Sequence, residues 1–252
     1  MKIAVITGAS SGMGREMVLQ LSDHFSGFDE IWIIARRAER LAELDGQVSV
    51  RLRPFALDLE REEDLKKLEL ALKEAAPDVK FLVNAAGYGK IGSVGSLNIK
   101  DETGMVRLNC EALCGVTHMV LPYMTHNSRI IMFASAAAFL PQPEFSVYAA
   151  TKAFVLSYSR ALGEELRDRD IAVTAVCPGP VKTEFFDIAE TTGQIPLYKL
   201  LVMANPRHVV RAALKDSIMK RDISIYGITM KAFFLLTKVV PHKMLLYVMR
   251  KF

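Results

Sequence analysis

The stretch Thr7-Gly8-Ala9-Ser10-Ser11-Gly12-Met13-Gly14 follows a short β-rich run, Lys2 to Thr7, at the start of this 252-residue chain. Glycines permit a tight turn and a close approach of the backbone to a phosphate. A helix beginning near Gly12 would direct its free N–H groups at that phosphate. Three glycines at this spacing after a strand therefore indicate a dinucleotide-binding turn. A glycine-rich turn without a ligand is the alternative interpretation.

Short β-rich runs recur along the chain and alternate with helical patterns. The runs span residues 2–7, 30–35, 48–55, 80–84, 129–135, 172–177 and 223–226. This alternation predicts a doubly wound α/β fold, with about seven parallel strands and helices on both faces. Ligands bind such a sheet at the carboxyl ends of its strands. No Pro/Gly/Ser-rich linker interrupts the pattern, so we expect one domain over residues 1–252.

A second pattern, Tyr148-x-x-x-Lys152, begins thirteen residues beyond Ser135. A phenol is a poor acid or base near neutral pH because its ordinary pKa is about 10. An ammonium four residues on shares its helix face and favours the phenolate, so the pair can transfer a proton. A nucleotide beside a proton donor indicates hydride transfer to or from a carbonyl or alcohol carbon.

These motifs together resemble the short-chain dehydrogenase/reductase family over nearly the whole chain. The matching positions are Thr7-Gly-x-x-x-Gly12-x-Gly14, Asn84-Ala85-Ala86-Gly87, Asn109, Ser135, Tyr148-x-x-x-Lys152 and Pro178-Gly179. The resemblance implies a Rossmann fold and a nicotinamide-dependent oxidoreductase, such as a carbonyl reductase or alcohol dehydrogenase. One position departs from the family's Asn-Asn-Ala-Gly turn, because Ala85 replaces the second asparagine. The small residues and Gly87 still permit close approach to the cofactor ribose.

The resemblance implies four catalytic residues. Tyr148 is expected to exchange the proton with the substrate oxygen, and Lys152 to lower the pKa of Tyr148 and hold the nicotinamide ribose. Ser135 is expected to donate a hydrogen bond to the substrate oxygen, and Asn109 to shape a helix that passes protons through water.

The residues after the second strand bear on the choice between NAD and NADP. An acidic residue there would accept hydrogen bonds from the adenosine ribose, whereas an arginine favours the 2′-phosphate of NADP. The strand ends in Ala35-Arg36-Arg37, which predicts NADP rather than NAD, with Arg36 as the main phosphate ligand and Arg37 or Arg15 in reserve. The alternative is that Arg36 and Arg37 only begin a solvated helix.

Further cofactor contacts follow from the resemblance. Asp58 is expected to accept a hydrogen bond from the adenine amine, and Thr183 to lie near the nicotinamide carboxamide. The remaining expected contacts are Gly8, Ser10, Ser11, Gly12, Met13, Gly14, Leu59, Asn84, Ala85, Gly87, Tyr148, Lys152, Pro178, Gly179 and Val181.

Residues 184–204 are rich in apolar side chains and carry few charges, which predicts a lid that excludes water from the reacting carbon. We expect Phe139, Leu140 and Phe145 to line the same apolar pocket. The expected substrate is a hydrophobic ketone, aldehyde or secondary alcohol, with steroids and acyl-chain lipids as examples. Asn205-Pro206 then predicts the start of a helix.

The C-terminal tail, residues 228–252, is basic and apolar. Residues 219–252 carry seven Lys/Arg against Asp222 alone, whereas the first 218 residues carry 25 basic and 27 acidic side chains. Two short helices separated by Pro241 are expected. They suit either a membrane interface or a cover over the lid or a second subunit, and we favour the second interpretation. Family resemblance implies a homodimer or homotetramer.

Other classes of function receive little support. We find no interleaved surface aromatic residues in the tail and no recognition motif for nucleic acid. Three cysteines, Cys110, Cys114 and Cys177, favour a reduced compartment, and no metal-ligand cluster is expected. No apolar run is long enough to span a bilayer, and the start does not resemble a signal peptide, so we expect a cytoplasmic protein. The alternatives to an enzyme are an NADP-binding sensor without turnover and a membrane-peripheral interaction protein.

Overall fold

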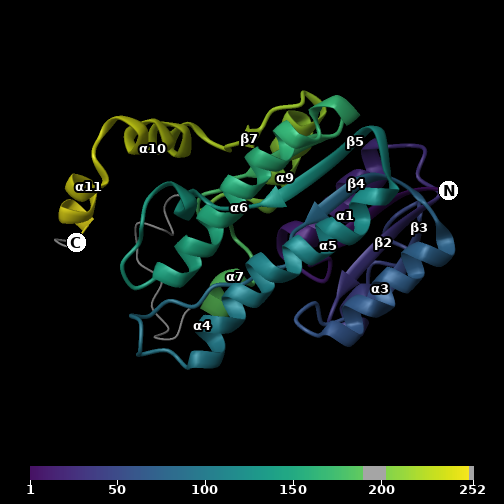
Figure 1. The fold of residues 1–252 in the computed structure, drawn as a ribbon, viewed down its shortest axis with the longest axis horizontal. Coiled ribbons are helices and arrows are strands. Elements are labelled where there is room, and N and C mark those ends of the chain that lie inside the picture. Colours follow the sequence, from purple (N-terminus) through teal and green to yellow (C-terminus); the bar gives the residue numbers. More distant parts are fainter. Residues whose placement is uncertain (190–202, 250–252) are drawn as a thin grey trace.

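One parallel sheet organises the described residues, 1–189 and 203–249 of the computed structural model. Its strands are β1 (Lys2–Thr7), β2 (Glu30–Ala35), β3 (Arg51–Ala56), β4 (Asp78–Asn84), β5 (Met124–Phe133), β6 (Ala172–Val176) and β7 (Ile223–Ser224). Their order is β3-β2-β1-β4-β5-β6-β7 (Figure 1). The chain therefore runs outward from β1 to β3 and resumes at β4 on the other side of β1. This reversal places a ligand crevice between the carboxyl ends of β1 and β4.

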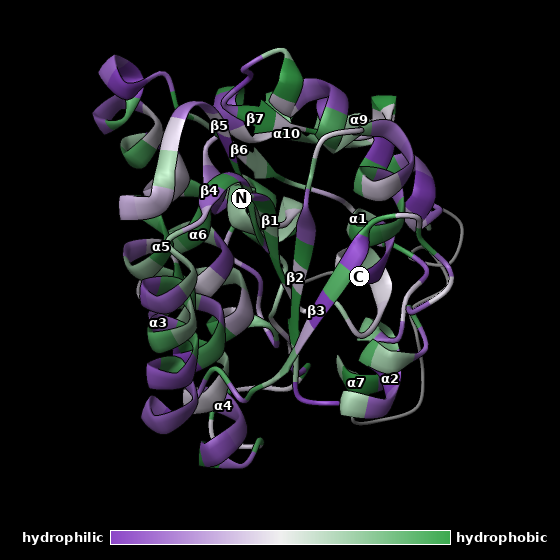
Figure 2. Cartoon of the chain, turned by 90° about the vertical axis from the view of Figure 1, so that its right-hand side faces the viewer, coloured by the Kyte–Doolittle hydropathy of each residue, from purple (hydrophilic) through white to green (hydrophobic). Residues whose placement is uncertain are grey.

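Helices cover both faces of the sheet (Figure 2). One face carries α1 (Gly12–His24), α2 (Ala38–Ala42) and α9 (Pro206–Ile218), and the other carries α3 (Glu62–Ala75), α4 (Ile99–Val106), α5 (Leu113–Val120) and α6 (Ser146–Glu165). Shorter segments are the π-helical turn η1 (Arg107–Ala112), the 3-10 turns η2 (Leu121–Tyr123), η3 (Ala136–Phe139) and η4 (Arg167–Arg169), and the helix α7 (Phe185–Ala189). The tail forms α10 (Ile228–Val239) and α11 (His242–Met249). The predicted doubly wound fold with a helical C-terminal region is confirmed.

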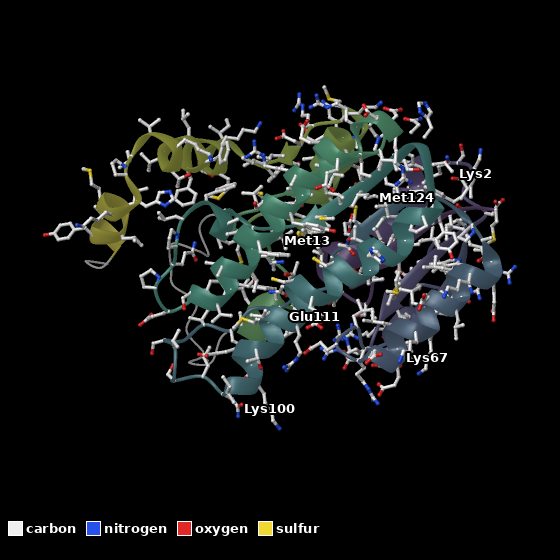
Figure 3. The ribbon with its side chains drawn as sticks, in the orientation of Figure 1. Lys2, Met13, Lys67, Lys100, Glu111 and Met124 are labelled. Carbon is white, nitrogen blue, oxygen red and sulfur yellow. The ribbon has the colours of Figure 1, made fainter. Side chains whose placement is uncertain are left out.

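The strands supply two hydrophobic cores, one on each face. Along β1, Ile3 and Val5 join the core beneath α5 and α6, while Ala4 and Ile6 join the core beneath α1 and α9. Side chains alternate between faces along a strand, so a strand covered on both faces must be apolar throughout. Figure 3 shows Lys2 and Met124, at the starts of β1 and β5, at the same end of the sheet, as parallel strands require.

The observed strands differ from the predicted runs mainly at their ends. β1 and β2 have the predicted bounds, but β3 begins at Arg51 because the amide of Ser49 donates to the Ser22 hydroxyl at 3.2 Å, outside the sheet. β5 begins earlier and ends earlier than residues 129–135. Ser135 leaves the strand because its Oγ accepts a hydrogen bond from the amide of Ala137 at 3.1 Å and so starts η3.

The glycine-rich turn packs directly on the turn after β4. Gly8 has a φ of +69°, and a Cβ there would lie 2.7 Å from the amide nitrogen of Ala86. Thr7 fixes the same contact, since its Oγ1 accepts hydrogen bonds from the amides of Ala85 and Ala86, both at 3.1 Å. The first and fourth strands are thus held together at the point where a nucleotide would enter.

The segment after residue 202 confirms the expected helix start and the two tail helices. Asn205 caps α9, its side chain accepting from the amide of Arg207 at 2.9 Å, with Pro206 as the first helical residue. Figure 1 shows α10 and α11 projecting from one end of the molecule. No helix in the described part of the chain is long and apolar enough to cross a bilayer.

Gly14→Ala tests the close packing of the turn against α1. A Cβ on Gly14 would lie 2.2 Å from the carbonyl oxygen of Gly8, so we expect the free energy of unfolding to fall by about 1–3 kcal/mol. The matched control is Gly115→Ala in α5, where the nearest atom lies 4.0 Å away and the helix should gain about 0.5–1 kcal/mol. Urea denaturation measures both, and equal effects would contradict the packing argument.

Candidate active site

Tyr148 lies in the first turn of α6 and is almost completely buried. Its ring stacks on Phe145, with centroids 4.3 Å apart and an interplanar angle of 22°. The ring of Phe185 in α7 contacts the same ring, with the two centroids 5.4 Å apart. A Cβ on Gly89 would lie 2.8 Å from Tyr148 Cδ2, so the chain after β4 also approaches this ring closely. The phenol is therefore held in an apolar aromatic pocket.

Ser135 connects Tyr148 to two other turns. Its hydroxyl hydrogen-bonds to the Tyr148 phenol, while its Oγ accepts from the amide of Ala137. The next amide, of Ala136, donates to the carbonyl oxygen of Pro178 at 2.8 Å. The turn after β5, the turn after β6 and the start of α6 thus meet at one place, although they are distant in sequence.

Lys152 lies one turn after Tyr148 and is also buried. Its Nζ donates to the carbonyl oxygen of Phe133 at 2.8 Å and lies 5.6 Å from the centroid of the Tyr148 ring. A Cβ on Gly87 would lie 3.4 Å from this Nζ. Ser135, Tyr148 and Lys152, which sequence analysis named together, are therefore brought together.

Burial favours the neutral forms of both groups and shifts their pKa values accordingly. Desolvation raises the pKa of Tyr148 to about 12, and the hydrogen bond from Ser135 opposes this increase only in part. Desolvation also lowers the pKa of Lys152 to about 8, with the nearby Cys110 and Cys177 acting in the opposite direction. The pKa of Tyr148 therefore lies above its ordinary value because desolvation is the largest effect on it, and a lowering by Lys152 stays a prediction.

Asn109 is fully buried in the π-helical turn η1. Its Oδ1 accepts from the amide of Tyr88 at 3.1 Å, and its Nδ2 donates to the carbonyl oxygen of Tyr88 at 2.9 Å and to Thr151 Oγ1 at 3.0 Å. Thr151 in turn donates to the carbonyl oxygen of Tyr148 at 2.7 Å. Asn109 therefore joins the chain after β4 to the helix that carries Tyr148.

The amino end of α1 fits a bound phosphate. Ser11 precedes the helix in an extended conformation, and its side chain does not cap the first turn, so N–H groups there are open to an anion. Gly12 has a φ of +53°, and a Cβ on it would lie 3.3 Å from the Thr183 side chain. Met13 is partly buried against the core that α1 covers. The glycine turn, the helix end and the close backbone approaches together fit a dinucleotide pyrophosphate.

The arginines after β2 occupy different environments. Arg36 is exposed and forms no ion pair with any residue in 1–189 or 203–249. Arg37 donates to Ser10 Oγ at 3.3 Å and pairs with Glu184 at 3.0 Å, and Arg40 pairs with the same carboxylate at 3.6 Å. Glu184 could not be identified from sequence patterns, because no local motif connects it to Arg37, 147 positions earlier.

The reserve arginine and the residues after β3 and β4 have their own partners. Arg15 donates to Gln47 at 2.8 Å. Asp58 Oδ1 accepts from the amide of Glu60 at 3.1 Å, and Leu59 is buried in the core. The amide group of Asn84 donates to Thr117 Oγ1 at 2.9 Å, so its side chain contacts α5. Ala85 lies in the turn held by Thr7.

The turn from Pro178 to Thr183 is covered on two sides. A Cβ on Gly179 would lie 2.5 Å from the Sδ of Met230 in α10, and Val181 forms a bridge with Ala204. Thr183 accepts from the amide of Phe185 at 3.4 Å. In the expected lid, α7 and residues 203–204 are described, and residues 190–202 lie outside the described part of the chain. Phe139 and Leu140 are buried, Phe139 packing against Phe234 of α10 with centroids 4.7 Å apart.

The cysteines and the charged clusters suggest no further chemistry at this site. Burial raises the pKa of Cys110 to about 11 and that of Cys177 to about 12, which disfavours reactive thiolates. Within residues 1–189 and 203–249, no group of three His, Cys, Asp or Glu side chains could hold a metal ion.

The fold and the site define a doubly wound nucleotide-binding protein in which the half-buried Ser135 lies with the buried Tyr148 and Lys152 at the carboxyl edge of the sheet. Comparison with known proteins assigns the family. The model of the short chain dehydrogenase family matches residues 2–192. The chain belongs to this family of NAD(P)-using oxidoreductases, which act on alcohol and carbonyl groups. The resemblance inferred from the motifs is confirmed at this level.

Individual relatives carry several different names. The chain is 32% identical over 222 residues to a very-long-chain 3-oxoacyl-CoA reductase of Emericella nidulans, covering 84% of this chain but only 60% of the relative. It is 35% identical over 189 residues to sulfoacetaldehyde reductase 2 of Chromohalobacter salexigens, covering 73% and 74% of the two chains. A solved short-chain dehydrogenase from Sphingobium yanoikuyae in complex with NADPH is 27% identical, covers 96% of this chain and 97% of its own, and has a TM-score of 0.79.

The shifted pKa values predict an unusual pH dependence of stability. Between pH 8 and 10.5 the unfolded chain keeps a proton on Lys152 that the folded chain has lost, so the free energy of unfolding rises with pH. Above about pH 10 the trend reverses, because folded Tyr148 keeps its proton. We expect Lys152 to contribute an increase of about 2 kcal/mol between about pH 7.5 and pH 9.5.

Urea denaturation of wild type, Lys152→Met and Lys100→Met checks this prediction. The increase should disappear in Lys152→Met and persist in Lys100→Met, which changes a residue in the first turn of α4. Identical pH profiles for all three proteins would show that Lys152 is not desolvated as the structure indicates.

Proposed function

We propose that this protein is an NADP-dependent oxidoreductase that interconverts a hydrophobic ketone or aldehyde and its alcohol. The observation that carries the proposal is the group formed by Ser135 and the buried Tyr148 and Lys152, beside a glycine-rich turn that fits a pyrophosphate. Bound NADPH would supply a hydride to the carbonyl carbon. Tyr148 gives its proton to the carbonyl oxygen, so the products are the alcohol and the oxidised nucleotide. The reverse sequence oxidises the alcohol.

The other residues of the site position and polarise the reacting groups. Ser135, whose hydroxyl lies beside the Tyr148 phenol, turns its single proton to the substrate oxygen when substrate is bound. Lys152 holds the nicotinamide ribose and returns a proton toward Tyr148, a role suited to an ammonium whose pKa is about 8. Asn109 fixes the geometry of α6 through Thr151. None of these steps requires a metal ion, because hydrogen bonds polarise the oxygen.

The surroundings of Tyr148 favour an apolar substrate. Phe145 and Phe185 flank its ring, and Met105 packs in the same cluster. These side chains exclude water and offer no charged partner to a polar substrate. Acyl chains and steroids fit this chemistry, and the name of the Emericella nidulans relative supports the acyl class.

For the protein as a whole, we propose a single domain that acts as a cytoplasmic homodimer or homotetramer. Met230 and Phe234 pack against the turns that contain Gly179 and Phe139, which supports a covering role for the tail. Exposed apolar residues on α10 and α11, including Ile228, Leu235 and Val239, support the alternative of peripheral membrane contact.

Tyr148→Phe separates an enzyme from an NADP-binding sensor. Removing the phenolic proton should lower kcat with hydrophobic carbonyls by at least about 100-fold, because general acid catalysis contributes about that much. NADPH affinity, followed by fluorescence titration, should stay unchanged. The control is Tyr158→Phe, ten residues further along α6, which should retain full activity. A Tyr148→Phe protein with wild-type turnover would exclude Tyr148 as the acid.

Arg36→Ala tests the cofactor preference. Loss of a charge-assisted hydrogen bond to the 2′-phosphate should weaken NADPH binding about ten- to a hundredfold and leave NADH binding unchanged. Arg40→Ala is the matched control, since Arg40 is also an accessible arginine near the end of β2 but pairs with Glu184. Fluorescence titration measures the affinity of the wild type and both variants for each of the two cofactors. Equal binding of NADPH and NADH by the wild type would overturn the NADP assignment.

A further inference from the structure

A cavity of about 410 Å³ lies between α6, β7 and α10. None of the residues assigned above to the cofactor or to catalysis lines it. Its volume is within the range of small-molecule sites, which span about 300–1,000 Å³. It therefore has room for a small ligand, or one end of a larger one.

The charged residues around this cavity leave an excess of positive charge. Asp216 accepts from Arg221 at 2.8 Å and from the Ser224 hydroxyl at 2.7 Å, and Asp222 pairs with Arg160 at 3.4 Å. Each acidic side chain therefore has its own arginine. The two remaining charged groups of the cavity wall are Lys231 and Lys238.

These two lysines lack acidic neighbours for a reason that is visible in the sequence. Asp222 is the last Asp or Glu of the chain, so α10 and α11 contain none. In residues 1–189 and 203–249, neither Lys231 nor Lys238 forms an ion pair. Two lysines seven residues apart lie on one face of α10, with Phe234 between them. The cavity thus carries two uncompensated positive charges on one wall.

The rest of the wall is apolar and well fixed. Leu156, Ile223, Ile225 and Phe234 line it, and Lys238 Nζ lies 5.4 Å from the centroid of the Phe234 ring. Hydrogen bonds join the floor of the cavity to β6. The Thr174 hydroxyl donates to the carbonyl oxygen of Arg221 at 2.7 Å, and the amide of Ala175 donates to the carbonyl oxygen of Asp222 at 2.9 Å. Phe234 also packs on Phe139, which holds α10 against the body.

We propose that this cavity is a binding site for an amphipathic anion, a carboxylate or phosphate joined to an apolar chain. Lys231 and Lys238 contact the anionic group, and Leu156, Ile223 and Phe234 contact the chain. An inorganic anion would leave the apolar wall unused, and an uncharged lipid would leave the two ammonium groups without a partner. The site does not depend on the hydride-transfer function proposed above, since it shares no residue with that site.

Isothermal titration calorimetry with decanoate, decyl phosphate and decanol tests the proposal on the full-length protein saturated with NADPH. The two anions should bind and decanol should bind more weakly. Lys231→Gln/Lys238→Gln should weaken binding of the anions by about tenfold, as expected for two partly exposed ion pairs. Lys243→Gln, in α11 and outside the cavity, removes a charge from the same tail and should have no effect.

The controls distinguish binding of the anion in this cavity from general attraction of anions to the basic tail. Equal affinity for decanol and the anions, no binding of either anion, or equal losses in the double variant and Lys243→Gln would overturn the proposal. Flotation with phosphatidylglycerol and phosphatidylcholine vesicles distinguishes the source of the anion. If the wild type binds only the anionic vesicles, and if only the double variant loses this binding, the result would support the site with a lipid headgroup as its ligand.

Discussion

The candidate active site depends on one buried amide, the side chain of Asn109. A buried amide must have its donors and acceptor satisfied, and Asn109 meets this requirement by bonding both backbone groups of Tyr88 together with Thr151. These bonds fix the distance between the chain after β4 and the first turns of α6. Gly87 is required beside them, because a Cβ there would lie 2.8 Å from Asn109 Oδ1. The π-helical turn that contains Asn109 aims its side chain into this space, which is typical of such turns at functional sites. The positions of Tyr148 and Lys152 follow from this constraint.

Sequence patterns predicted the parts of the molecule that obey local rules. Apolar runs gave β1 and β2 with their observed bounds, and Asn205-Pro206 gave the start of α9. Contacts between distant segments could not be predicted in this way. Asn84 matched the family turn, yet its side chain bonds Thr117 on α5, because a buried amide takes the nearest available partner. Arg37 was predicted to be a reserve ligand of the cofactor phosphate. In the structure it pairs with Glu184, which is distant in sequence and lies near it only in the folded chain. The side-chain partners of these two residues could therefore be identified only from the folded structure.

The tail shows the same dependence on tertiary structure. Its composition suited both a covering helix and a membrane-bound helix, since each needs apolar residues with basic flanks. In the structure α10 uses different faces for different contacts. Met230 and Phe234 pack on the turns around Gly179 and Phe139, whereas Leu235 and Val239 remain exposed. The two interpretations therefore do not exclude each other, because a helix can stabilise the catalytic turns on one side and present apolar residues on another.

Burial determines how costly it is for the proposed acid to lose its proton. The aromatic residues that make the pocket suitable for an apolar substrate also remove Tyr148 from water, which raises the pKa of its phenol to about 12. In the proposed reduction Tyr148 gives up its proton and becomes a phenolate, and the raised pKa makes this step more costly. Oxidation of an alcohol would need the phenolate, which requires a nearby positive charge. Lys152 is placed to provide it, but its pKa of about 8 leaves part of the population neutral near physiological pH. The energetic cost of the phenolate therefore applies to both directions of the proposed reaction, and a charged Lys152 lowers it in each.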